Sequence, residues 1–148
     1  MTGILRGSRR LLGLALAVAV LGTALVAADA GPAHAATTRY EAEQASRTGG
    51  AAVATDHTGY SGTGFVGGYV DANKGTATTS FAVSTSVAGT HTLALRYANG
   101  TGSAKTLTLL VDGAAQQITL GATANWDTWA SHSVAAARGA GSHTIAYR

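Results

Sequence analysis

Apolar and polar residues alternate along most of the chain after residue 40. In residues 91–97, Leu93, Leu95 and Tyr97 fall on one face of an extended chain, with small or polar residues between them. Because successive side chains of a strand point to opposite faces, this pattern predicts strands with one buried face. The segments that fit the pattern are 40–45, 79–83, 91–97, 106–111, 115–120, 126–134 and 142–147.

Gly, Asn, Asp, Ser and Thr separate these segments, and helical periodicity is nearly absent. Asp112-Gly113 lies between two of them and is a hairpin signal, because glycine tolerates positive φ. A β-domain buries its alternating faces between two sheets, so the pattern predicts an all-β sandwich or jelly roll. The residues expected to be mostly buried are Leu93, Leu95, Tyr97, Leu107, Leu109, Val111, Trp129 and Ile145.

Two segments of the chain resemble each other. Residues 88–96 and 140–148 are identical at six of nine positions, which places His91 and His143 in equivalent positions. Two copies predict a pair of equivalent strands, each entered through a glycine turn, and not a solenoid. The two histidines are then polar residues at strand starts or, alternatively, a paired metal site.

The first 35 residues have a different composition. Three arginines precede an apolar run over residues 11–28, and Ala33-His34-Ala35 is a small-x-small cleavage signal. We expect residues 1–35 to be a cleaved signal peptide, residues 36–39 a short linker and residues 40–148 the working domain of a secreted, extracellular protein. The adjacent arginines fit the Sec route and the twin-arginine route equally.

Removal of this segment leaves little net charge. Residues 36–148 hold seven Lys and Arg against six Asp and Glu, a net charge of +1. This balance does not suggest a nucleic-acid partner, and we expect no membrane partner after signal cleavage. The chain has no cysteine, so disulfides, thiolate zinc sites and thiol catalysis are excluded.

Two carboxylates stand two residues apart near the start of the predicted domain. If residues 40–45 form a strand, Glu41 and Glu43 project from the same face. Paired hard oxygens suit calcium, which also accepts backbone carbonyls. The alternative is a solvated acidic edge, and the spacing alone does not choose between the two.

The segment Asn125-Trp126-Asp127-Thr128-Trp129 contains two tryptophans. In an extended chain an offset of three puts them on opposite faces, so that one can be core while the other is exposed. Trp126 lies at the junction of loop and strand, where an exposed indole can stack on a sugar ring. The alternative is that both tryptophans belong to the core.

Five short motifs together cover nearly all of residues 40–148. They are Tyr40-Glu41-Ala42-Glu43, Gly59-Tyr60-Ser61-Gly62-Thr63-Gly64-Phe65-Val66, Arg96-Tyr97-Ala98-Asn99-Gly100, Trp126-Asp127-Thr128-Trp129 and Ala140-Gly141. They occur in the order seen in carbohydrate-binding modules of families 35 and 6, and the chain therefore resembles these families.

The resemblance implies a galactose-binding-like jelly roll that binds sugar with loops at one end, without catalysis, and holds a structural calcium. Trp126 occupies the position that stacks on the sugar. Loop placement and amide chemistry add Asn125, Asn99 and Tyr60 as partners, with Arg96 and Asp71 as further candidates. The calcium site would use the acids Glu41 and Glu43 and backbone carbonyls near Tyr60 and Ser61.

The chain departs from the families at its end. Their modules have one further strand with a calcium-binding Asp, whereas this sequence stops at Arg148. We therefore expect a C-terminally incomplete module with weakened calcium affinity, which is either a fragment of a longer protein with a catalytic domain or a truncated gene product.

Three functions compete. The first is a non-catalytic module that binds plant or microbial polysaccharides or oligosaccharides. The second is an extracellular adhesion domain that binds protein. The third is a small glycoside hydrolase, which would need two carboxyl groups facing each other across the bond, and the adjacent Glu41 and Glu43 do not fit that requirement.

Overall fold

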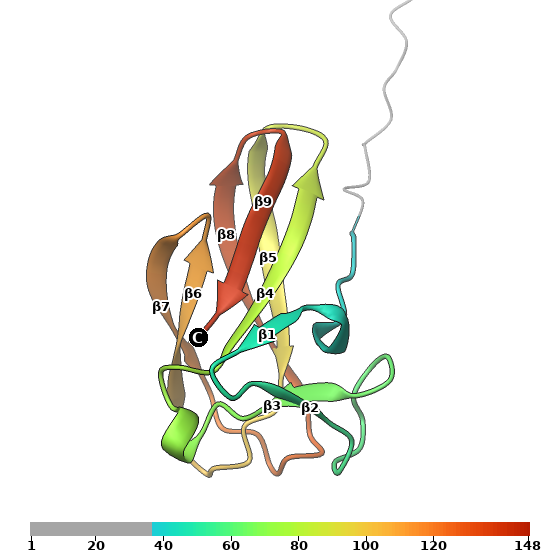
Figure 1. The fold of residues 1–148 in the computed structure, drawn as a ribbon, viewed down its shortest axis with the longest axis vertical. Helices are drawn as coiled ribbons and strands as arrows, with labels where there is room; N and C mark the ends of the chain where they lie inside the picture. The colour runs from blue at the N-terminus through green and yellow to red at the C-terminus, as the bar shows by residue number, and fades with distance from the viewer. Residues whose placement is uncertain (1–36) are drawn as a thin grey trace, which may run out of the picture. The chain divides into compact units, whose positions relative to one another are not determined.

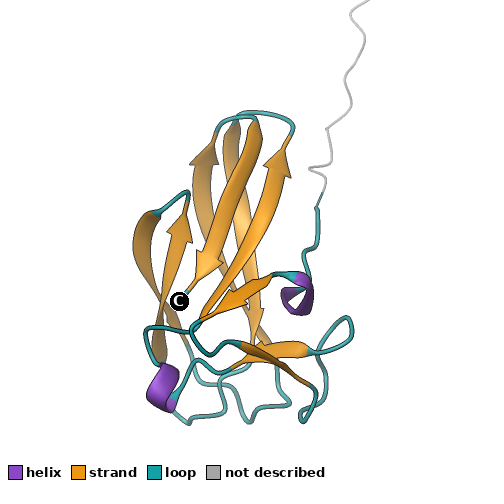
Figure 2. Ribbon diagram, viewed as in Figure 1, coloured by secondary structure: helices purple, strands orange, loops and turns teal. Residues whose placement is uncertain are grey.

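The structure is a computed structural model that describes residues 37–148. The predicted signal peptide and the first residue of the predicted linker lie outside the described residues. Residues Thr37–Arg148 form one compact unit. Its architecture is the predicted all-β sandwich (Figure 2). Within residues 37–148, no helix has the length and hydropathy needed to cross a membrane.

The strands form one five-stranded sheet and two antiparallel pairs. The sheet has the order β1-β4-β9-β6-β7, and the pairs are β2-β3 and β5-β8. Figure 1 shows β5 and β8 as a layer behind β4 and β9. The bounds are β1 Ser46–Thr48, β2 Ala52–Ala54, β3 Phe65–Gly67, β4 Thr78–Thr85, β5 Gly89–Tyr97, β6 Lys105–Val111, β7 Ala114–Leu120, β8 Ala130–Arg138 and β9 Gly141–Tyr147, with 3₁₀ helices η1 Ala42–Gln44 and η2 Asp71–Asn73.

The core lies between the two layers. Its buried members come from the five-stranded sheet, and half-buried residues of β5 and β8 pack against them. Of the residues predicted to be buried, Leu109, Val111 and Ile145 are buried, and Leu93, Leu95, Tyr97 and Leu107 pack half-buried against the core cluster. The buried cluster is Leu109, Val111, Ile118, Leu120, Ile145 and Tyr147.

The predicted hairpin joins β6 to β7. Asp112 and Gly113 have φ of 51° and 84°, so both central residues of the turn are left-handed. A two-residue turn of this kind matches the twist of the strands on either side, and it favours Asp followed by Gly. The prediction is confirmed.

The predicted strand over 40–45 is wrong. The amides of Gln44 and Ala45 donate to the carbonyls of Glu41 and Ala42, which closes the 3₁₀ turn η1. Arg47 stabilises the turn, because its Nη1 lies 2.7 Å from the Glu43 carbonyl and 2.8 Å from that of Ala45. The first strand therefore begins only at Ser46.

The predicted strand over 126–134 begins late, at Ala130. The Asn125 Oδ1 accepts hydrogen bonds from the Asp127 amide at 3.0 Å and from the Thr128 hydroxyl at 2.9 Å. Asn side chains commonly hold a turn in this way. Both tryptophans consequently lie in the loop before β8, so the argument from opposite strand faces does not apply to them.

The two similar segments form β5 and β9, each of which follows a crossover between the layers. His91 Nε2 lies 3.0 Å from the Val87 carbonyl, and His143 Nε2 lies 3.0 Å from the Gly139 carbonyl. Each histidine thus stabilises the preceding crossover by a hydrogen bond to the carbonyl four residues before it. Residues 37–148 contain no group of three or more His, Cys, Asp or Glu side chains that could hold a metal ion.

Candidate functional site

Three loops meet at one end of the sandwich, here called the loop end. They are residues 55–64, 98–104 and 121–129. The Thr58 amide donates to the Asp127 carboxylate at 2.6 Å, joining the first loop to the third. The Thr123 amide donates to the Asn99 carbonyl at 2.8 Å, joining the third loop to the second. The loops therefore support one another and form one surface.

Trp126 presents an exposed indole on this surface. It retains 38% of its accessible surface and is one of the few large apolar residues exposed in the domain. The backbone of Gly100 lies directly against the ring, because a Cβ there would meet Cγ and Cδ1 of Trp126 at 2.8 Å. The indole is therefore both positioned and open to a ligand.

His57 and Asp127 flank the indole, and sequence reasoning missed both. The imidazole of His57 stacks with the Trp126 ring at a centroid distance of 6.1 Å and an angle of 27°. Its Nδ1 lies 3.6 Å from Asp127 Oδ1. The available sequence signal was weak: His57 lies two residues before the glycine-rich motif, and Asp127 immediately follows Trp126.

Trp129 lies beneath the loop end and outside the buried core cluster. Its Nε1 donates to the Thr58 carbonyl at 2.9 Å, and its ring meets Phe65 edge-on. The Arg96 guanidinium lies 4.8 Å from the ring centroid and donates to the Gly59 carbonyl at 2.7 Å. As predicted, Trp129 is mostly buried, although it packs under a loop and not in the buried core cluster.

Asn99 has a structural position. Only 5% of its surface is exposed. Its Nδ2 donates to the carbonyls of Ser103, Leu120 and Gly121, and its Oδ1 accepts from the Thr101 hydroxyl at 2.7 Å. The predicted sugar contact is corrected here, because the amide is buried and its polar atoms already bond to the protein.

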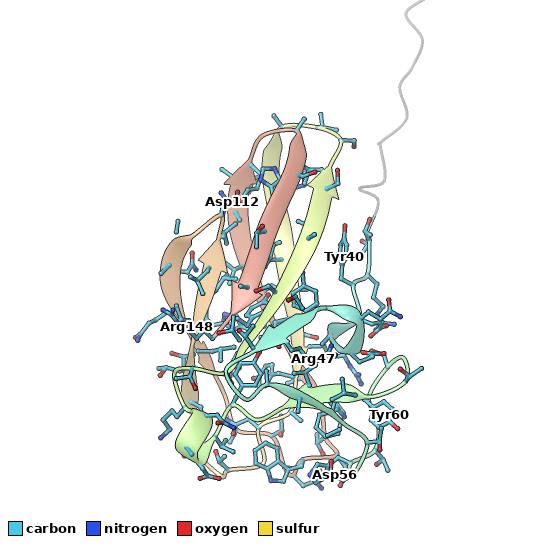
Figure 3. The ribbon with its side chains drawn as sticks, viewed as in Figure 1. Tyr40, Arg47, Asp56, Tyr60, Asp112 and Arg148 are labelled. Carbon is cyan, nitrogen blue, oxygen red and sulfur yellow. The ribbon has the colours of Figure 1, made fainter. Side chains whose placement is uncertain are left out.

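The other predicted contacts differ in their surroundings. Asn125 is exposed, but its Oδ1 holds the turn before Trp129, so Nδ2 is the part left for a ligand. Tyr60 packs half-buried against Phe65, and Figure 3 shows it with Asp56 at the end away from Asp112. Asp71 lies in η2 with φ of 55°, and no hydrogen bond or ion pair in residues 37–148 links it to Trp126.

The two predicted calcium carboxylates converge, although not by strand geometry. Glu41 Oε2 accepts a hydrogen bond from the Ser61 hydroxyl at 2.9 Å, and Glu43 Oε1 accepts one from the Thr63 amide at 2.8 Å. Gly62 lies between these contacts, and a Cβ on it would collide with the Glu43 carboxylate. The turn η1 and the loop around Gly62 therefore form an acidic cradle.

Hydrogen bonds from backbone amides favour the ionised form of two carboxylates, those of Glu43 and Asp127. The Thr63 amide lowers the pKa of Glu43, with a smaller contribution from the Arg47 charge. The Thr58 amide likewise lowers the pKa of Asp127, with the Thr58 hydroxyl and His57 adding to the effect. Hydrogen bonds to the charged form favour that form, so both groups carry a negative charge at neutral pH.

A hollow of about 390 Å³ lies where residues 39–41 and 44–46 approach residues 80–82 of β4, and Trp126 does not line it. An open ring surface suits a sugar that stacks on one face and remains partly hydrated, so a cavity is not required there.

A β-sandwich whose joined loops hold an exposed indole has the form of a carbohydrate-binding module. The family model described as "Carbohydrate binding module (family 35)" matches residues 38–148, so the chain belongs to that family. A solved family 35 module from Clostridium thermocellum has a TM-score of 0.67 at 26% identity over 73% of this chain and 82% of that one.

The curated relatives are much longer proteins. A 1,6-alpha-glucosyltransferase of Sporosarcina globispora is 39% identical over 88% of this chain. A cycloisomaltooligosaccharide glucanotransferase of Niallia circulans is 39% identical over 75%, and an exo-beta-D-glucosaminidase of Amycolatopsis orientalis is 36% identical over 84%. The matched regions span only 10%, 11% and 12% of these relatives.

Proposed function

We propose that this protein is an exported, non-catalytic module that binds α-1,6-linked glucose oligosaccharides at its loop end. The observation that carries the proposal is the exposed, positioned indole of Trp126 in a member of a carbohydrate-binding family. The C–H face of a pyranose covers an indole well, and polar groups beside the ring bond the hydroxyls.

The choice of sugar rests on the relatives. Two of them are named for α-1,6-glucosyl transfer or for cyclic isomaltooligosaccharides. A third is named for β-D-glucosamine, which makes glucosamine oligosaccharides the competing ligand. Since the three loops carry Asp56 and Asp127 and no Lys or Arg, the loop end is acidic rather than basic, and we do not favour acidic sugars as ligands.

The non-catalytic part of the proposal rests on the carboxylates. Glu41 and Glu43 both face the same short loop at Ser61 and Thr63. A glycosidase instead needs two carboxyl groups on opposite sides of the bond that it cleaves. The small share of the relatives that this chain matches supports a second partner, namely a catalytic domain in a longer parent protein.

We also propose a structural calcium at the acidic cradle. Two carboxylates converge on Gly62, whose missing side chain lets the Glu43 carboxylate approach the loop. Hard oxygens of Glu41 and Glu43, with the Ser61 hydroxyl and the carbonyls of Tyr60 and Ser61, fit what calcium accepts. Bound calcium would neutralise the two carboxylates and tie η1 to this loop.

Export is proposed from the sequence alone. The basic start, the apolar run and the Ala33-His34-Ala35 signal are the features of a cleaved secretory peptide. Release of the protein into the culture medium, with Ala36 as its first residue by mass spectrometry, is the expected result.

A glycan array tests the binding function directly. We expect isomaltooligosaccharides to bind with a Kd of about 10 μM to 1 mM, as is typical of one stacking contact and a few wet hydrogen bonds. Oligosaccharides of β-1,4-glucosamine and of uronic acids serve as controls. Stronger binding to either control would overturn the sugar assignment, and no binding to any glycan would favour the protein-adhesion alternative.

A further inference from the structure

His57 contacts the proposed sugar platform directly. Its ring stacks with Trp126 and lies 5.9 Å from the Phe65 ring centroid, so it joins the exposed indole to the aromatic residues beneath. The side chain is 32% exposed, and part of it therefore faces solvent beside the indole. A second flat ring next to Trp126 enlarges the surface on which a pyranose can rest.

The two ring nitrogens of His57 have different surroundings. Nδ1 faces Asp127 Oδ1 at 3.6 Å. That same oxygen accepts hydrogen bonds from the Thr58 amide at 2.6 Å and the Thr58 hydroxyl at 3.2 Å, which fix the carboxylate in place. Because a fixed negative charge favours a proton on the nitrogen that faces it, the neutral imidazole carries its hydrogen on Nδ1.

Nε2 is then the free acceptor. It makes no hydrogen bond within residues 37–148. It is also not buried there, so it is accessible to solvent. An unprotonated, solvent-accessible nitrogen beside a stacking ring accepts a hydrogen bond from a neutral hydroxyl. Pyranose hydroxyls supply such donors.

We propose that His57 is a second sugar-contacting residue, which adds its ring to the Trp126 platform and accepts a sugar hydroxyl at Nε2. Asp127 is the positioning residue that sets the tautomer of His57. The inference rests on the proposed function, because it places the same ligand on the same surface. It assigns a hydrogen-bond acceptor to a site where Asn99 is already bonded within the protein.

Two substitutions of His57 distinguish a direct contact with the sugar from a purely structural role beside Asp127. The amide of Gln extends to the position of Nε2, whereas the shorter amide of Asn reaches only the position of Nδ1. We expect His57→Gln to bind isomaltotriose within about threefold of wild type, and His57→Asn to lose about tenfold, the effect of one ligand hydrogen bond and part of a ring contact. Isothermal titration calorimetry measures both, with thermal midpoints as the folding control.

The result that overturns the inference is His57→Asn binding at least as tightly as His57→Gln, since this would make His57 only a support for Asp127. If wild type binds isomaltotriose and Trp126→Ala does not, such a result removes the His57 contact and leaves the proposed function intact. If wild type does not bind isomaltotriose, the result contradicts both the His57 contact and the proposed function.

Nuclear magnetic resonance gives the same answer without a variant that has to fold. In ¹⁵N-labelled wild type, isomaltotriose should shift the Nε2 resonance of His57 more than the Nδ1 resonance. A larger shift at Nδ1, or no shift at either nitrogen while the sugar binds, would contradict the contact.

Discussion

At the scale of single residues, the two tryptophans of the loop end have different structural roles. Trp126 is exposed, and its indole nitrogen donates no hydrogen bond within residues 37–148. Trp129 donates to the Thr58 carbonyl, meets Phe65 and lies under the Arg96 guanidinium. The first indole is therefore available to a ligand, and the second connects the loops to the sandwich.

Replacing each tryptophan should separate binding from stability. Trp126→Ala should abolish sugar binding and lower the thermal midpoint less than Trp129→Ala does, because the Trp126 ring is exposed and donates no hydrogen bond within residues 37–148. Trp129→Ala should lower the free energy of unfolding by about 2 kcal/mol through the lost hydrogen bond and half-buried ring. Calorimetric titration and thermal melts measure the two effects, and an exchange of the two phenotypes would show that the roles are reversed.

Gly100 positions the indole by having no side chain. A methyl group at this residue would lie 2.8 Å from two ring atoms of Trp126, so Gly100→Ala should displace the indole and weaken sugar binding about tenfold or more. Gly121→Ala is the matched control, because its Cβ would meet only the Tyr97 hydroxyl, at 3.8 Å. Equal binding by the two variants would argue against a fixed indole.

At the scale of elements, η1 and the loop around Gly62 form the acidic cradle, so their stability should respond to calcium. Calcium at millimolar concentration should raise the thermal midpoint, because a ligand bound only by the folded state stabilises it. The double variant Glu41→Ala, Glu43→Ala should lose this shift. Asp56→Ala is the control, as it removes an exposed carboxylate with no hydrogen bond in residues 37–148.

An unchanged thermal midpoint of wild type in calcium would count against the cradle as a calcium site. The same conclusion would follow if the double variant kept the full shift. Magnesium gives a further comparison, since it demands a stricter octahedral arrangement and should stabilise the cradle less.

At the scale of the whole molecule, a charged cluster forms far from the loop end. His143 Nδ1 lies 2.8 Å from Asp112 Oδ2, and Arg138 Nε lies 3.9 Å from the same oxygen. Figure 3 shows Asp112 well away from Tyr60 and Asp56. The cluster joins the β6–β7 turn to the start of β9, so it contributes to the fold and not to the site.

This cluster should give the stability a pH optimum. The Asp112 hydrogen bond raises the pKa of His143, so its contribution is complete below the ordinary value of about 6.5 and is lost as pH rises through the raised pKa. The Thr144 amide lowers the pKa of Asp112, whose contribution is complete above about 3.8 and is lost as pH falls through the lowered pKa. Stability should therefore be highest between about pH 4 and 6.5.

Thermal melts across pH 3 to 9 test this dependence. His143→Gln should remove most of the decline above pH 6.5, because the titrating partner of Asp112 is gone. His91→Gln is the control, since His91 occupies the equivalent position in β5 and contacts a carbonyl but no carboxylate in residues 37–148. A His143→Gln profile that follows wild type above pH 6.5 would contradict the assignment.

The sequence by itself determined the local features of this protein. Alternation predicted the strands that became β4 to β7 and β9, because the period of a strand is a property of neighbouring residues. Asp112-Gly113 predicted its hairpin for the same reason. The position of Trp126 in a polar loop predicted an exposed ring, although the strand argument behind it was wrong.

Only the tertiary structure decided which distant residues meet. Thr58 and Asp127 are 69 positions apart, and no pattern in the sequence pairs them, yet their hydrogen bond sets the surroundings of His57 and Trp126. Asn99 is polar and lies in a loop, but carbonyls from 4 to 22 residues away bury its amide. Likewise, the Arg47 guanidinium donates to the carbonyls of Glu43 and Ala45 and thereby stabilises the 3₁₀ turn η1. In a strand these carbonyls would point in other directions. Periodicity reports which face of an element is apolar, whereas contacts between loops depend on where the packed sheets bring them together.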